Sequence, residues 1–277
     1  MTRYALSATT PVLLRPDGAV QVGWDPRRAV VVRPPSGLSA PTLANMLRLL
    51  QSGAELVDLQ SDAPGVDGAI VEELVASLVD AGVVTRGLAG RGRAAAVRIH
   101  GRGPLSDLLA GALRCSGARV THSNRTDTGA PSGPTDLVVL ADYLVAEPRV
   151  VRELHAVGVA HLPVRVRDGL GLVGPLVIPG VTSCLGCADL HRSDRDAAWP
   201  AVAAQLRHTV GSADRATVLG TAALALNQVD RVIRAVRGDG GTNSGDPPPT
   251  LDTTLEFDVN TGAVVARRWS RHPRCAC

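Results

Sequence analysis

The chain has 277 residues, of which 45% are hydrophobic, 20% charged and 2% aromatic, and its formal net charge is +3. This composition predicts a globular protein of one large domain or two ordinary ones, and neither the small net charge nor any basic run points to a nucleic-acid partner. No apolar run is long enough for a signal peptide or a membrane span, so we expect a cytoplasmic protein that binds no membrane. All 29 basic residues are arginines, so no lysine can hold a triphosphate.

The first 87 residues have the pattern of a small α+β domain. Three short apolar segments separated by turn residues predict strands at 12–15, 19–24 and 29–33. Ser39 then begins a helix that runs to Gln51, and a second helix begins at Asp67 or Gly68 after a loop. Val83 returns the chain as a strand. This order predicts a winged-helix-like domain, followed by a linker at 88–93.

A domain of this kind can bind DNA through a recognition helix or an extended peptide along an exposed sheet edge. The second predicted helix carries Glu72, Glu73 and Asp80. Because DNA binding depends on neutralising phosphates with basic side chains, these acidic residues favour the peptide.

Residues 94–277 alternate between strand and helix patterns. Strands are predicted at 95–99, 117–121, 136–140, 161–166 and 170–178, and helices at 104–115, 148–157, 200–206 and 213–236. A βαβ series of this kind predicts a Rossmann-like, mostly parallel, doubly wound sheet. A Gly/Pro-rich segment at 238–249 precedes two alternating segments at 251–259 and 263–269, which predict a β-hairpin.

The turn after the first of these strands contains Gly101, Arg102 and Gly103. Glycines between a strand and a helix allow backbone N–H groups to approach a phosphate, so these three residues are candidate nucleotide ligands. However, the usual third glycine is Ser106, and the acidic residue expected at the end of the next strand is replaced within 121–124. A doubly wound fold needs a tight turn here with or without a ligand, and both interpretations stay open.

Asp142 follows the third of these strands, where parallel sheets place ligand-binding residues, and it could hold Mg²⁺ or serve as a helix-start or loop carboxylate. Cys115, beside Leu113 on a predicted helix, is expected to be a core cysteine. No nucleophile-elbow triad, HExxH or P-loop motif is present.

Four of the five cysteines form two close pairs, Cys184 with Cys187 and Cys275 with Cys277. Four soft thiolates suit tetrahedral Zn²⁺. Because four cysteine ligands fill the coordination sphere of the ion, they indicate a structural rather than a catalytic site. The long gap between the pairs predicts a clasp that ties the end of the chain to its middle. Disulfides are the alternative, but five cysteines leave one unpaired. Two nearby histidines could replace a ligand, although four thiolates make this unnecessary; they are His191 and His272.

The order of these parts resembles the ubiquitin-activating (ThiF-like) adenylyltransferase superfamily. The resemblance rests on the glycine turn after a strand, the strand ending in an aspartate, the segment 179–187 with its cysteine pair, the long helix and the second cysteine pair. The ending 271–277, Arg-His-Pro-Arg-Cys-Ala-Cys, is similar to a branch found with cyclodehydratases of thiazole/oxazole-modified peptides. In that branch, leader-peptide-binding proteins use an N-terminal winged-helix element, which residues 10–85 match in pattern.

The resemblance implies structural zinc on Cys184, Cys187, Cys275 and Cys277, and a catalytic, magnesium-binding role for Asp142 if the chain is active. The incomplete glycine turn and the missing lysine imply instead a non-catalytic scaffold. It would bind a precursor (leader) peptide and present it to a partner modifying enzyme such as a cyclodehydratase. The alternative is an active adenylyltransferase that uses ATP and Mg²⁺ to activate the carboxylate of a peptide or small protein. Superfamily members are commonly dimers, so a homodimer is possible.

Overall fold

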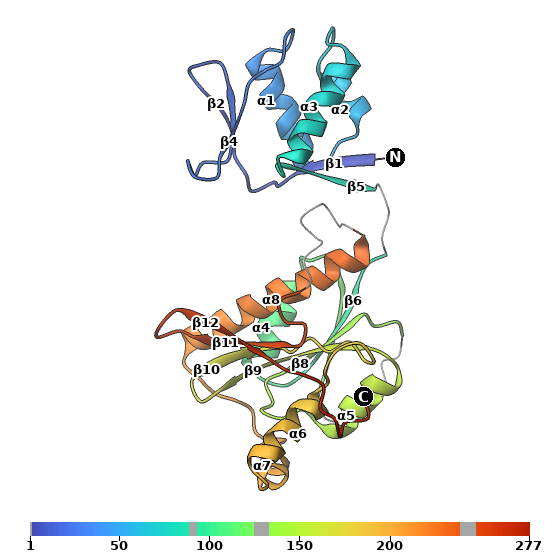
Figure 1. The fold of residues 1–277 in the computed structure, drawn as a ribbon, viewed down its shortest axis with the longest axis vertical. Helices are drawn as coiled ribbons and strands as arrows, with labels where there is room; N and C mark the ends of the chain where they lie inside the picture. Colours follow the sequence, from blue (N-terminus) through green and yellow to red (C-terminus); the bar gives the residue numbers. More distant parts are fainter. Residues whose placement is uncertain (1, 89–92, 125–132, 239–247) are drawn as a thin grey trace. The chain divides into compact units, whose positions relative to one another are not determined.

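A computed structural model describes residues 2–88, 93–124, 133–238 and 248–277 (Figure 1). The chain divides after Gly92 into two compact units. Across the described ranges, no helix combines the length and apolar character needed to cross a lipid bilayer. Parts of three predicted segments lie outside the described residues: the linker (89–92), the loop after the second strand of the larger unit (125–132) and the Gly/Pro-rich segment (239–247).

The first unit contains five strands among its described residues: β1 (Thr2–Leu6), β2 (Val12–Leu14), β3 (Val20–Val22), β4 (Val30–Val32) and β5 (Val84–Leu88). β1 pairs with β5, and β2, β3 and β4 form a separate antiparallel sheet in that order. Side chains alternate across the small sheet, so Val20 and Val22 of its central strand are fully buried while Leu13 and Val31 are exposed on the other face. β1 was not predicted, because Thr2–Leu6 has no turn signal before it.

Three helices complete this unit: α1 (Ala40–Gln51), α2 (Leu56–Asp62) and α3 (Gly68–Asp80). α1 packs against β1, β2 and β3, α2 packs against α1 and α3, and α3 packs against β5. As predicted, Ser39 caps α1, and its Oγ accepts the N–H of Thr42 at 3.2 Å. α2 lies where the sequence predicted a loop, and the Asp58 carboxylate accepts the N–H of Glu55 at 2.9 Å at its start. The core of this unit is mostly leucine and valine, with Leu43, Met46, Leu47, Leu50, Leu59 and Val84 fully or almost fully buried.

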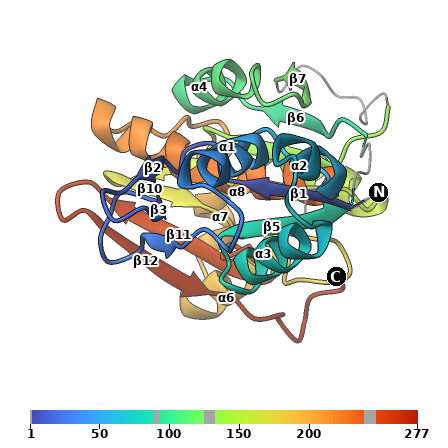
Figure 2. The ribbon, with the colours of Figure 1, turned by 90° about the horizontal axis from the view of Figure 1, so that it is seen from above.

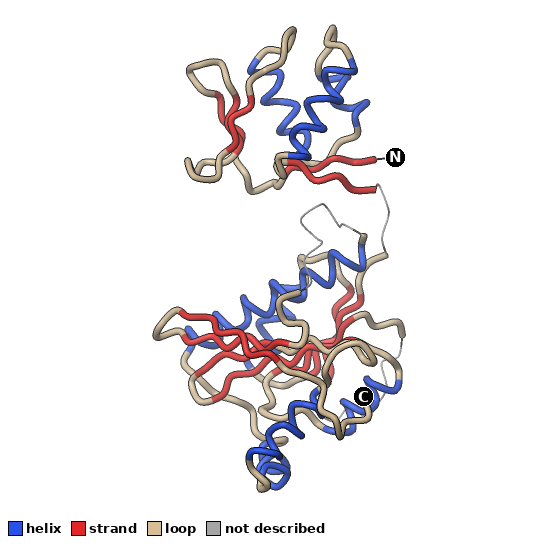
Figure 3. The backbone as a smooth tube through the Cα atoms, viewed as in Figure 1, coloured by secondary structure: helices blue, strands red, loops and turns tan. Residues whose placement is uncertain are grey.

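In the second unit, the described strands form one seven-stranded sheet in the order β12-β11-β10-β9-β8-β6-β7 (Figures 2 and 3). The strands are β6 (Ala96–His100), β7 (Arg119–Ser123), β8 (Leu137–Ala141), β9 (Ala160–Arg167), β10 (Leu170–Val173), β11 (Thr253–Asp258) and β12 (Ala263–Arg268). β7, β6, β8 and β9 are parallel, and β10, β11 and β12 continue the sheet antiparallel. The predicted parallel core and C-terminal hairpin are therefore confirmed.

Helices cover both faces of this sheet, as the doubly wound prediction requires. α4 (Pro104–Leu113) and α8 (Arg215–Arg237) pack on one face, and α5 (Pro148–Ala156) and α6 (Leu185–Arg195) on the other, with α7 (Trp199–Leu206) beside α6. β8 shows why both faces are apolar. Leu137 and Val139 join the α4–α8 core, whereas Val138 and Leu140 join the core that contains Leu154 of α5.

Two predictions were wrong in detail. The strand predicted over 170–178 ends at Val173 as β10, because Pro175 has no N–H to continue the ladder, and beyond it only isolated bridges form at Leu176 and Val177. Cys115 is exposed rather than part of the core. α4 ends at Leu113, so Cys115 lies beyond the helix's buried stripe.

Candidate functional site

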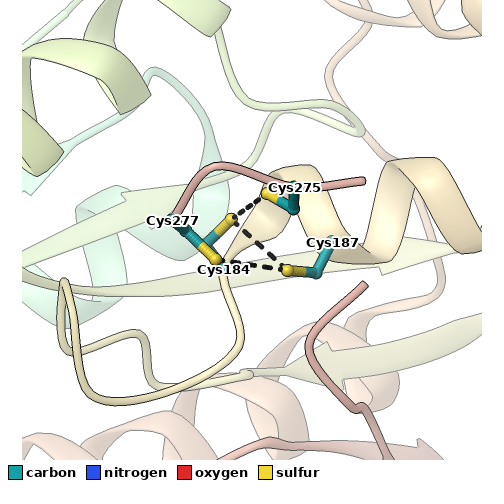
Figure 4. Close-up of side chains that lie close together, drawn as sticks. All are labelled: Cys184, Cys187, Cys275 and Cys277. Carbon is teal, nitrogen blue, oxygen red and sulfur yellow. Dashed lines mark hydrogen bonds between the residues drawn. The ribbon is translucent and has the colours of Figure 1, made fainter. Parts of the chain in front are cut away.

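The four predicted cysteines come together in the second unit (Figure 4). Cys184 is the N-cap of α6 and Cys187 lies in its first turn, while Cys275 and Cys277 arrive from the end of the chain. The Sγ atoms of Cys184 and Cys187 are 3.8 Å apart, those of Cys184 and Cys275 3.5 Å, and those of Cys187 and Cys277 3.4 Å. All four sulfurs lie within 4.8 Å of one another.

This geometry fits a tetrahedral metal site. A Zn²⁺ ion with Zn–S bonds of about 2.3 Å places its ligands about 3.8 Å apart, close to the observed separations. The sulfurs are too far apart for disulfides, whose S–S bond is about 2.05 Å, and all four cysteines are free thiols. Four cysteines that a soft metal could bind are thus held together by the fold, and the predicted clasp geometry is confirmed.

The electrostatic surroundings of the four thiols are uneven. Burial raises the pKa of Cys184. Burial also acts to raise the pKa of Cys187, but backbone hydrogen bonds at His272 and Cys184 and the neighbouring thiols lower it to about 7. Cys187 therefore loses its proton more readily than an ordinary thiol, and the resulting thiolate is the form that binds a metal ion.

A second set of contacts holds the C-terminal segment against α6. His272 Nε2 lies 2.8 Å from Asp194 Oδ2, and the Arg274 guanidinium donates to the other Asp194 oxygen. The rings of His191 and His272 pack edge to face with centroids 4.7 Å apart, beside the four cysteines rather than among them. These contacts orient the segment that carries Cys275 and Cys277.

The glycine turn and Asp142 also meet, although they are far apart in sequence. Asp142 is buried, and its Oδ1 and Oδ2 accept the backbone N–H groups of Leu105 (2.9 Å) and Ser106 (3.3 Å) in the first turn of α4. The carboxylate therefore occupies the N-terminal end of α4, where the helix dipole favours negative charge. Burial raises the pKa of Asp142, and the hydrogen bonds from α4 oppose this effect.

Close packing against Asp142 explains the two glycines. A Cβ on Gly101 would lie 2.7 Å from the Ala141 carbonyl oxygen, and a Cβ on Gly103 would lie 2.8 Å from Asp142 Oδ1. Ser106, at the position of the usual third glycine, accepts the Gly103 N–H with its Oγ at 3.0 Å. Arg102 is exposed. The structure thus brings Gly101, Gly103 and Asp142 close together, whereas Arg102 lies exposed at the surface.

A cleft that sequence reasoning missed lies between α5, α6, α7 and the end of β9. Its volume is about 780 Å³. Its walls are largely apolar but include six arginines: Arg152, Arg165, Arg167, Arg192, Arg195 and Arg207. These residues are spread over four elements with no local motif, so only the folded chain reveals them as a group.

β4 of the first unit is the other exposed feature. Like β2, it is one of the two edge strands of the small sheet. In the small sheet it pairs only with β3. Val20 and Val22 of β3 are 0% and 3% exposed, but Val30 and Val32, which lie opposite them on β4, are only half-buried. A further strand beside β4 would cover these two valines.

The sequence and the fold were compared with those of known proteins. No protein-family model matches the chain, and no curated protein matches it. Several solved structures share the fold, including two heterocyclases and MccB. A heterocyclase in complex with substrate and cofactor has a TM-score of 0.67 and 16% identity, over 100% of this chain and 39% of that one. The heterocyclase TruD has a TM-score of 0.66 and 18% identity, over 100% and 42%. E. coli MccB, solved with ATP, has a TM-score of 0.58 and 12% identity, over 99% of both chains.

Two of these neighbours are heterocyclases and the third, MccB, is a microcin C7 biosynthetic enzyme, and the expected resemblance is confirmed at the level of the fold. The chain spans about two fifths of the length of the heterocyclases and nearly all of MccB. At sequence identities of 12% to 18%, the structural similarity supports a shared fold but not a shared activity, so function has to be inferred from this chain's own residues.

Proposed function

We propose that this protein is a non-catalytic scaffold that binds a precursor (leader) peptide and presents it to a partner modifying enzyme such as a cyclodehydratase. The observation that carries the proposal is the Asp142 carboxylate at the N-terminus of α4. The backbone N–H groups of Leu105 and Ser106, which could have bound a phosphate, already bind a carboxylate of the protein itself.

The same carboxylate argues against the adenylating alternative. Adenylation requires cations around the triphosphate and a ligand for Mg²⁺. Asp142 is buried and bound to α4 by two hydrogen bonds, Arg102 is exposed, and the sequence contains no lysine. Nucleotide binding by this turn would first have to displace the Asp142 carboxylate from these two N–H groups.

The peptide-binding half of the proposal rests on β4. Its outer edge can accept the backbone hydrogen bonds of an extended peptide, and such a peptide would bury Val30 and Val32. The structural neighbours supply a parallel, because MccB has been solved in complex with N-formylated MccA and a heterocyclase in complex with substrate. Residues 1–87 would be the recognition domain, with the winged-helix-like role expected from the sequence.

We assign the cysteine cluster to structural Zn²⁺. Four thiolates close the coordination sphere, leaving no open position for a substrate. The ion would fix α6 to the C-terminal segment and so hold the sheet's second face in place. Residues 94–277 would then be a degenerate activating-enzyme domain that supports the recognition domain.

The nucleotide part is tested by titrating the metal-loaded protein with ATP·Mg²⁺ in a calorimeter and by assaying ATP–pyrophosphate exchange. We expect no heat of binding and no exchange. Micromolar binding, with exchange that is lost in an Asp142→Ala variant, would establish the adenylyltransferase instead.

The peptide part is tested with a displayed library of random 16-residue peptides selected against the whole protein. Peptides that bind β4 should bind a Val30→Ser/Val32→Ser variant at least tenfold more weakly, because both side chains lie beside the open edge. Val31→Ser is the matched control, since Val31 lies on the same strand but is 47% exposed on the opposite face. Selected peptides that bind all three proteins equally would exclude β4 as the docking edge.

A further inference from the structure

Arg165 is the unusual residue of the arginine-lined cleft. It lies near the end of β9 and is only 9% exposed. Among the residues that the structure describes, its guanidinium makes one hydrogen bond, from Nη1 to the Leu144 carbonyl oxygen at 3.0 Å, and no ion pair. A guanidinium has five N–H donors, so most of those on Arg165 have no protein partner in the described part of the chain.

Its neighbour Arg192 is held very differently. The Arg192 guanidinium lies over the rings of Trp199 (5.1 Å) and Trp269 (5.0 Å), and its Nη1 pairs with Asp189 Oδ1 at 2.9 Å. The same Asp189 oxygen accepts the Trp199 indole N–H at 3.1 Å. Arg192 is therefore fixed in place, and Asp189 is already engaged by these two groups.

The charges that line the cleft do not balance. Six arginines and three aspartates line the cleft, the aspartates being Asp168, Asp189 and Asp196. Two of the arginines also pair with glutamates outside the lining, Arg207 with Glu147 (3.6 Å) and Arg167 with Glu256 (3.9 Å). Asp189 pairs with Arg192, and Asp168 lies 3.5 Å from Arg167. Neither carboxylate neutralises Arg165, and burial lowers its pKa to about 10. A buried cation without a counterion is unfavourable, so this arrangement favours an anion from outside.

We propose that this cleft binds an oxyanion, a carboxylate or a phosphate, carried on a ligand with an apolar body, and that Arg165 is its anchor. The planar guanidinium can donate two parallel hydrogen bonds to such a group. The ordered Arg192 adds positive charge, and the apolar walls, which include Leu144 and Leu185, receive the rest of the ligand. The cleft lies entirely in the second unit, so this inference does not depend on peptide docking at β4.

The test uses the metal-loaded full chain and two probes, inorganic pyrophosphate and the dipeptide acetyl-Leu-Glu. Thermal unfolding is followed against probe concentration at constant ionic strength, with sodium chloride as the baseline. Three proteins are compared: the native chain, Arg165→Met and Arg114→Met. Arg114 is an exposed arginine just after α4 and outside the cleft, so its variant controls for the loss of one positive charge.

We expect at least one probe to raise the unfolding midpoint of the native chain with saturation. Arg114→Met should behave alike, and the apparent Kd should be at least tenfold weaker in Arg165→Met. A response to pyrophosphate alone assigns a phosphate ligand, and a response to the dipeptide alone assigns a carboxylate. Without probe, Arg165→Met should be at least as stable as the native chain, because an unpaired buried charge has been removed.

Two results would overturn the proposal. One is the absence of any saturable response above the chloride baseline. The other is a response of equal strength in Arg165→Met. A clear loss of stability in Arg165→Met without probe would also count against it, since Arg165 would then act through its bond to Leu144 as a structural residue.

Discussion

Breaking the cysteine clasp should remove a large part of the second unit's stability. The double variant Cys275→Ser/Cys277→Ser leaves the pair on α6 in place but deprives the metal of half its ligands. A metal bound by all four thiolates would link residues 91 and 90 positions apart, Cys184 with Cys275 and Cys187 with Cys277. A cross-link closing a loop of about 90 residues restricts the unfolded chain by about 4–5 kcal/mol. Typical domains have total stabilities of about 5–15 kcal/mol.

Urea unfolding followed by tryptophan fluorescence measures this loss. Two of the three tryptophans, Trp199 and Trp269, lie in the second unit, whereas Trp24 is 76% exposed and responds little. We expect the free energy of unfolding to fall by about 4 kcal/mol in the double variant. A chelator should produce a similar fall in the native protein and no further fall in the variant. Metal content is measured on the same samples.

Cys115→Ser is the matched control, because Cys115 is exposed and lies outside the cluster. It should keep both the metal and the native stability. The reasoning would be refuted if the native protein purified without metal, or if the double variant unfolded at the same urea concentration as the native chain.

Three further predictions concern the glycine turn and a buried histidine. Gly103→Ala places a Cβ 2.8 Å from Asp142 Oδ1 and should lower the free energy of unfolding by about 1–3 kcal/mol in the same urea assay. Gly111→Ala is the control, because a Cβ at Gly111 on α4 meets no atom within 4 Å, and it should be neutral or stabilising. Asp142→Ala removes the carboxylate that accepts the first N–H groups of α4, so the free energy of unfolding, measured without ATP, should fall by about 1–2 kcal/mol. An unchanged free energy of unfolding would mean that these two hydrogen bonds do not stabilise α4. Burial lowers the pKa of His161 from 6.5 to about 4. Between these values the unfolded chain binds the proton and the folded chain does not, so His161 should lower stability by about 3 kcal/mol from pH 7 to pH 4. The pH dependence of His161→Leu should be smaller by this amount.

Much of the fold could be predicted because local patterns determine it. The apolar run of β8 is long enough for a strand buried on both faces, and its alternate residues do enter two different cores. The four clustered cysteines could be named across their long gap because cysteines in two closely spaced pairs are chemically distinctive. α2 was missed, although Glu55 followed three residues later by Asp58 is a capping signal that could have revealed it.

The two most informative features of the site could not be predicted, because each depends on contacts distant in sequence. Asp142 meets the N–H of Leu105 across 37 residues, and nothing near Asp142 distinguishes a helix cap from a magnesium ligand. Arg165 lies in an alternating strand, where the pattern gives no sign that a charged side chain is buried. Only the packing of α5, α6 and α7 around the end of β9 makes it the anchor of a cleft.

The Asp142 carboxylate at the start of α4 also bears on whether peptide binding would depend on the ATP concentration in the cell. An enzyme that must hold ATP before it can bind its peptide is tied to the energy supply, since its affinity for the peptide follows the nucleotide concentration. Here the Asp142 carboxylate accepts the α4 N–H groups of Leu105 and Ser106 within the folded chain itself. Peptide capture by this protein should therefore be equally strong with and without ATP, and any dependence of the modification on energy would belong to the partner enzyme alone.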